Sequence, residues 1–137
     1  MVTDAGLAEL IGMVPRSEYE LAQIEEKGLP TKLLSRLREK GLTFTEVSEL
    51  VIAPRTLKHR KARKEALSRQ ETERLVRVAR ILALAESIFG NRQKALIWLR
   101  TPDDELNGKT PMRMLQTESG ARLVEQLLWG IDEGVYS

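Results

Sequence analysis

Residues 55–64 carry seven basic side chains and no aspartate or glutamate. Arginine and lysine donate hydrogen bonds to base edges in the major groove of DNA, and both neutralise phosphates. Basic helices on protein surfaces more often carry acidic residues one turn away, which pair with the cations. We therefore expect this segment to contact a polyanion. The alternative is a solvated face of a helical bundle.

Other residue types do not favour catalysis. The chain has no cysteine and a single histidine, His59, whose sequence neighbours include no carboxylate that would orient its ring. Neither a glycine-rich phosphate loop nor a nucleophile–base motif is found. Asp103, Asp104 and Glu105 are consecutive, which rarely suits one metal ion, so we expect a helix start or a solvated loop there. The sequence predicts a protein that is not an enzyme and holds no cofactor or metal.

The net charge of +2 is distributed unevenly along the 137 residues. Residues 1–26 carry one basic side chain against six acidic ones, a net −5; residues 27–80 carry fifteen against six, a net +9; residues 81–137 carry six against eight, a net −2. No apolar run approaches the roughly 18 residues of a membrane helix, and the acidic N-terminus does not resemble a signal peptide. We expect a cytoplasmic protein that binds a polyanion through its middle and has no membrane contact.

Helix signals dominate the chain, so the predicted fold class is all-α. Three capping-box patterns occur, Ser17-x-x-Glu20, Thr43-x-x-Glu46 and Ser68-x-x-Glu71. They predict a helix over 18–27, a short helix after Thr43, and a long amphipathic helix over 68–88 that belongs to both halves of the chain. Two more helices are expected around 95–100 and 118–129.

Residues 43–66 have the spacing of a helix-turn-helix. A helix of about eight residues is followed by a tight turn at Ile52–Ala53 and by a basic helix over 56–66, with Pro54 in its first turn. Leu57 should dock inward on Val47 and Leu50. Five residues then face outward or flank that face and are the candidate DNA contacts: Arg55, Thr56, Lys58, His59 and Arg63.

An ordered series of motifs in the C-terminal third resembles a known family. It runs Gly90-x4-Ala95-x2-Trp98-Leu99-x2-Pro102, Leu106-x-Gly108-x-Thr110-Pro111, Leu115-x-Thr117-Glu118-x-Gly120-Ala121 and Ile131-x2-Gly134-Val135-Tyr136. This series is similar to the toxin-binding domain of Xre/ParS-type antitoxins, the partners of RES-domain toxins. Upstream, Arg55-Thr56-Leu57 with Leu67-Ser68 and Glu71 resembles the helix-turn-helix of that family.

The resemblance implies two binding activities. The helix-turn-helix would bind the operator of the protein's own operon as a homodimer and repress it, and the C-terminal domain would block a RES toxin that degrades NAD⁺. Val135, Tyr136 and Ser137, which follow the flexible Gly134, would enter the active-site cleft of the toxin; Trp129 and Ile131 are the next candidate contacts. A chain end of this kind is otherwise commonly frayed.

The expected organisation is an N-terminal helical extension over 1–27, a helix-turn-helix region over 28–88, and a toxin-binding domain over 89–137. The fold would be a helix-turn-helix bundle joined through a long helix to a small helical domain. Two alternatives remain open at this point. One is a stand-alone transcription regulator whose C-terminal half only dimerises, and the other is a structural helical bundle.

Overall fold

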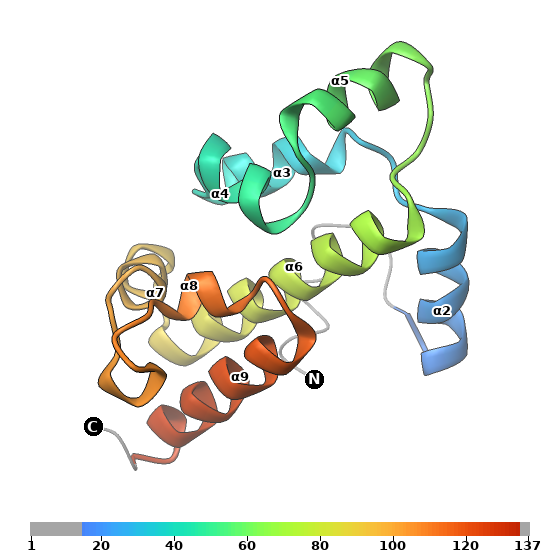
Figure 1. Ribbon diagram of the computed structural model, residues 1–137. Helices are drawn as coiled ribbons and strands as arrows, with labels where there is room; N and C mark the ends of the chain where they lie inside the picture. The colour runs from blue at the N-terminus through green and yellow to red at the C-terminus, as the bar shows by residue number, and fades with distance from the viewer. Residues whose placement is uncertain (1–14, 135–137) are drawn as a thin grey trace.

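The chain is almost entirely helical in the computed structural model, which describes residues 15–134 (Figure 1). Over that range no β-strand is formed, and one isolated bridge joins Asp103 to Lys109. The all-α prediction is confirmed. The helices in order are α2 (Glu18–Lys27), α3 (Leu33–Glu39), α4 (Phe44–Leu50), α5 (Pro54–Ala62), α6 (Arg69–Phe89), α7 (Arg92–Leu99), the 3-10 helix η1 (Asp104–Leu106), α8 (Pro111–Met114) and α9 (Glu118–Asp132).

Side-chain caps begin the helices where the sequence predicts them. Thr43 and Ser68 each form a complete capping box with the glutamate three residues later. Ser17 forms half of one: its hydroxyl accepts from the Glu20 N–H, whereas the Glu20 carboxylate accepts from the Arg16 N–H instead. Helix starts are set by residues within one turn, which explains why local sequence predicts them well.

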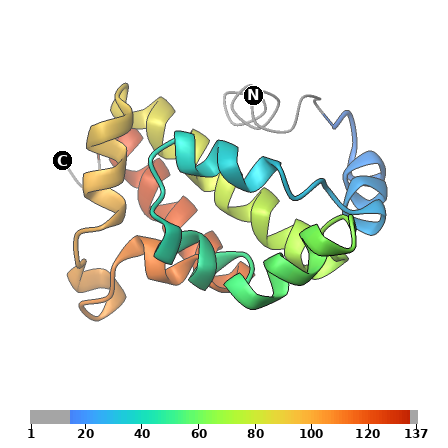
Figure 2. The same cartoon turned by 90° about the horizontal axis from the view of Figure 1, so that it is seen from above.

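The long helix α6 joins the two halves of the molecule (Figure 1). It contacts α4 toward its N-terminal half and packs against α7 and α9 beyond that. Figure 2 shows α2 at one end of α6 and α7 at the other. Its apolar face includes the buried residues Leu75, Val78, Ala79 and Leu82, and Ile88 is half-buried. One hydrophobic core therefore runs through both halves, and α6 belongs to both as predicted.

The structure differs from the predictions at the ends of two helices and in one short helix. The basic helix ends at Ala62 rather than at residue 66, because Lys64 adopts a left-handed backbone conformation (φ 56°) that closes it. Helix α9 runs to Asp132 rather than to residue 129. The short helix α8 was not predicted, since four residues are too few to show a helical period, whereas η1 begins at the acidic cluster, where a helix start was one expectation.

Two features hold α9 in place. Gly120 packs so closely on the Met114 carbonyl that a Cβ at this position would overlap it. Glu118 accepts from Arg77 Nε at 3.1 Å and from Arg80 Nη2 at 3.0 Å, which ties the start of α9 to α6. Burial raises the pKa of Glu118, but the two guanidinium groups outweigh it and hold that pKa below its usual value.

Within residues 15–134, no helix combines the length and apolarity required to cross a membrane.

Candidate functional site

The α4–α5 pair forms the predicted helix-turn-helix. Helix α4 ends at Leu50, the turn contains the buried residues Val51 and Ile52, and Pro54 occupies the first turn of α5. Leu57 is half-buried and packs against the core that contains Val47 and Leu50, so its inward direction is confirmed. The burial of this one side chain fixes which residues of α5 face outward.

The candidate DNA contacts lie on α5 and on the turn after it. Arg55, Lys58 and His59 are exposed on the helix, and Arg63 is exposed at its C-cap. Thr56 is half-buried. The structure therefore presents a basic surface near the N-terminal end of α6 (Figure 2). That these five residues contact DNA stays a prediction.

Two of the basic residues in this segment have acidic partners. Arg63 pairs with Glu65 at 3.8 Å, and Arg60 has a larger set of contacts. Arg60 donates to both carboxylate oxygens of Glu71, from Nε at 3.1 Å and from Nη2 at 3.3 Å, and pairs with Glu65 at 3.3 Å. Glu71 also accepts from the Ser68 N–H at 2.8 Å as part of the capping box. The expectation of an uncompensated helix is thus corrected for Arg60 and Arg63, whose carboxylate partners lie beyond residue 64.

Glu71 should make stability depend on pH. Burial raises its pKa, but the hydrogen bonds from Arg60 and from the Ser68 N–H outweigh that effect and hold the pKa below the usual value of 4.5. The folded chain therefore binds fewer protons than the unfolded chain as pH falls through this range. The stabilisation that Glu71 contributes is fully present above its pKa in the unfolded chain and is lost as pH falls through its pKa in the folded chain.

We expect Glu71→Gln to lower the free energy of unfolding by about 1–2 kcal/mol at neutral pH, because Arg60 loses its charged acceptor. Thermal melting measured from about pH 7 to about pH 3 should show that the stabilities of the two proteins converge at the acidic end. Ser35→Ala, a change at an exposed position of α3, is the control, and its stability should depend on pH as that of the wild type does. A variant with the full wild-type pH dependence would contradict this role of Glu71.

The predicted toxin contacts on α9 fall on two different sides of the helix. Trp129 is 39% exposed and lies on its outer side. Ile131 is half-buried and lines a cavity of about 100 Å³ together with Trp98, Asp103, Glu105 and Leu127. Two residues along a helix correspond to about 200° of rotation, which separates these two side chains. The structure thus does not bring Trp129 and Ile131 together.

The predicted tail contacts begin where α9 ends. Gly134 is exposed with φ 82°, a left-handed conformation that suits glycine after the last helical turn. Val135, Tyr136 and Ser137 lie outside the described residues.

Leu123, 46% exposed on α9, is an apolar surface residue that the sequence analysis did not single out. The sequence gives little indication that Leu123 is exposed, because a leucine in an amphipathic helix is assigned to the core by default.

Asp103 has the role expected for the acidic cluster. Its carboxylate accepts from the Glu105 N–H at 2.8 Å and caps η1. It also lines the small cavity beside Ile131. The cluster thus shapes the loop that leads from α7 to α8.

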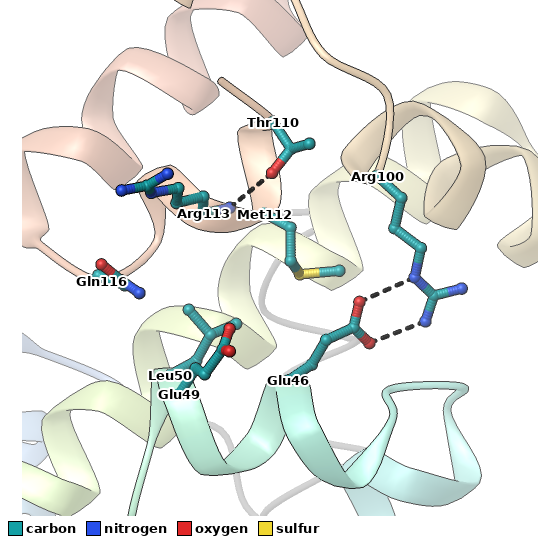
Figure 3. Close-up of a pocket in the computed structure, with 8 residues that line it drawn as sticks. All are labelled: Glu46, Glu49, Leu50, Arg100, Thr110, Met112, Arg113 and Gln116. Atoms are coloured by element: carbon teal, nitrogen blue, oxygen red, sulfur yellow. Dashed lines mark hydrogen bonds and ion pairs between the residues drawn. The ribbon is translucent and has the colours of Figure 1, made fainter. Parts of the chain in front are cut away.

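A bidentate ion pair connects α4 to the C-terminal end of α7, a contact that the sequence analysis did not find (Figure 3). Arg100 donates to Glu46 from Nε at 2.9 Å and from Nη2 at 2.8 Å, and also to the Gly41 carbonyl at 2.8 Å. Burial raises the pKa of Glu46, but Arg100 and the Thr43 N–H outweigh it and lower that pKa. These two residues border a cavity of about 520 Å³ between α4 and α8, whose lining also includes Glu49, Leu50, Thr110, Met112, Arg113 and Gln116.

These features define a class of protein with a helix-turn-helix and a separate helical domain packed on the same long helix. Residues 20–80 match the antitoxin Xre-like helix-turn-helix domain, and residues 84–134 match the antitoxin Xre/MbcA/ParS C-terminal toxin-binding domain. The chain belongs to the Xre antitoxin family.

Curated relatives extend over most of the chain. The chain is 38% identical over 118 residues to an antitoxin Xre of Pseudomonas putida, which covers 86% of this chain and 74% of the relative. It is 31% identical over 131 residues to an antitoxin Xre of Photorhabdus laumondii, covering 93% and 88% of the two chains. A third antitoxin Xre, of Yersinia enterocolitica, is 33% identical over 87 residues, covering 63% and 59%.

Proposed function

We propose that this antitoxin neutralises a RES-domain toxin that degrades NAD⁺, and that it represses its own operon by binding operator DNA. The proposed division is an extension over residues 1–27, a helix-turn-helix region over 28–88 and a toxin-binding domain over 89–137. The protein would act in the cytoplasm as a homodimer within a larger toxin–antitoxin complex. Arg55, Thr56, Lys58, His59 and Arg63 would contact DNA.

The observation that supports this proposal is the separation of the two surfaces. Basic α5 lies beside the N-terminal half of α6, whereas the C-terminal end of α9 lies away from it, toward the end of the molecule that holds α7 (Figure 1). Trp129 belongs to the last turn of α9. One chain can therefore hold DNA and toxin at the same time without competition between them.

Blocking the toxin requires only a fitted segment that excludes its substrate, so the antitoxin supplies no chemistry. An aromatic ring in the tail suits a pocket that otherwise receives a flat nucleotide ring. We therefore propose that Val135, Tyr136 and Ser137 enter the active-site cleft, while Gly134 provides the bend and the body of α9 holds the toxin.

Changing Tyr136→Asp, or deleting residues 134–137, should restore NAD⁺ consumption by the co-purified toxin while leaving operator binding unchanged. The measurement is an NAD⁺-consumption assay on the complex beside a growth test. Leu123→Asp, a charge placed on the body of α9, serves as the comparison and should instead weaken the complex itself. Full inhibition by the tail-less antitoxin would show that the block is made by the domain body. No capture of an adjacent RES toxin would favour the stand-alone regulator.

A further inference from the structure

A second concentration of positive charge surrounds a cavity of about 570 Å³ beside α5. Its walls come from residues 27–32, between α2 and α3, and from residues 61–66, where α5 gives way to α6. The Leu67 N–H donates to the Leu29 carbonyl at 2.9 Å, which holds the two segments side by side (Figures 1 and 2). Gly28 packs so closely on the Leu67 carbonyl that a Cβ there would overlap it. The cavity is therefore fixed by backbone contacts.

The charge lining this cavity is almost entirely positive. Its single carboxylate, Glu65, already pairs with Arg60 at 3.3 Å and with Arg63 at 3.8 Å. In the part of the chain that the structure describes, no carboxylate forms an ion pair with the lysines that line the cavity. Those lysines are Lys27, Lys32, Lys61 and Lys64. Four like charges around one cavity favour an anion that can neutralise several of them.

The backbone conformation of Lys64 ends α5 beside the cavity. Lys64 has φ 56°, and the next N–H, that of Glu65, donates to the Arg60 carbonyl at 2.9 Å to close α5. Glycine or asparagine takes this left-handed position at the end of a helix with least strain. A lysine at this position places a positive charge at the end of α5, where it lines the cavity. The side chain of Lys64 is thereby placed at the cavity.

We propose that this lysine-lined cavity holds the phosphate backbone of the operator beside the base pairs that α5 faces. This inference rests on the proposed operator binding. Lys61 belongs to α5 itself and lies one turn after both Leu57 and Lys58, so it leads from the edge of the outward face at Lys58 toward the side of the helix on which the cavity lies. Contacts to phosphate fix the position of a protein on DNA but read no sequence. The cavity would therefore set the register of α5 and contribute equally to all duplexes.

The test is the double change Lys61→Gln with Lys64→Asn, because asparagine tolerates the left-handed backbone and keeps the end of α5. Affinity is measured against salt concentration for the operator and for an unrelated duplex. Counted per protomer of the proposed homodimer, here and below, each lost phosphate contact should make the slope of log K against log salt shallower by about 0.9. The double variant should therefore change it by about 1.8 per protomer, or about 3.6 for the dimer. Affinity should fall by a similar factor on both duplexes.

Lys94→Gln with Lys109→Gln is the matched control, since it removes two exposed positive charges from the C-terminal half. Its slope and affinity should equal those of the wild type. Lys32→Gln provides a variant outside α5, with an expected change in slope of about 0.9. Thermal melting establishes that each variant is folded.

Unchanged slopes in the Lys61/Lys64 and Lys32 variants would overturn this inference while leaving operator binding by α5 intact. A loss of affinity for the operator alone, with unchanged affinity for the unrelated duplex, would also overturn the inference, because such a loss would place the lysines among the base contacts. Loss of toxin capture with unchanged DNA affinity would assign them to a protein partner instead. Failure of the wild-type chain to prefer its operator over unrelated DNA would contradict the proposed function itself.

Discussion

Replacing both Arg55 and Lys58 with alanine should weaken operator binding by about 2–6 kcal/mol, because each contact to a base edge is worth roughly 1–3 kcal/mol. Both side chains are exposed on α5, and neither forms an ion pair within residues 15–134. Their removal therefore costs the fold little. Fluorescence anisotropy with labelled operator measures the loss, and it should exceed the loss on unrelated DNA.

The control for this double variant must separate contact from fold. Lys94→Ala with Lys109→Ala removes the same charge at a distance from α5 and should retain operator affinity. Circular dichroism should show that the Arg55/Lys58 variant keeps its helical content and melting temperature. A variant that loses helicity together with DNA binding would show that these side chains support the fold, contrary to the prediction.

The features that could be predicted from the sequence depend on neighbours within a few residues. Thr43 and Ser68 signal helix starts because the cap and its partner lie three positions apart. Leu57 could be oriented because it is the only large apolar side chain in a polar helix. Gly90, with φ 69°, ends α6 where the sequence places the break.

The features that were missed depend on the packed structure. Glu46 and Arg100 are 54 residues apart, and the capping box that identifies Glu46 gives no indication that Arg100 is its partner. The same is true of Arg77 and Glu118, which are 41 residues apart. Such pairs form only after the α4–α7 and α6–α9 contacts bring the backbones together. The sequence predicted the long helix that joins the helix-turn-helix to the toxin-binding domain, but not the side-chain contacts made between them.

The candidate site on α9 shows a further limit. Trp129 and Ile131 are close in the sequence and were grouped as toxin contacts, yet helical rotation places them on different sides. Ile131 is half-buried beside Trp98, so its substitution would disturb the fold as well as any interface. Trp129 is the residue on which toxin binding can be tested with the least structural damage.

We expect Trp129→Ala to weaken the complex with the partner toxin by about 2–4 kcal/mol, since tryptophan is enriched among the few residues that dominate an interface. This corresponds to a rise in Kd of roughly 30-fold to 1,000-fold. Isothermal titration with purified toxin measures it directly. Operator binding should be unaffected, because α5 lies away from the C-terminal end of α9 (Figure 1).

Tyr19→Ala is the matched control, because Tyr19 is another exposed aromatic residue, 71% exposed on α2. Helix α2 lies near the N-terminal end of α6, on the other side of the molecule from the end of α9 (Figure 1). If large exposed apolar groups merely favoured nonspecific association, both variants would bind toxin less tightly. A loss confined to Trp129→Ala identifies the outer side of α9 as part of the toxin interface. Equal affinity of Trp129→Ala and the wild type would instead leave the tail and the Ile131 side of α9 to hold the toxin.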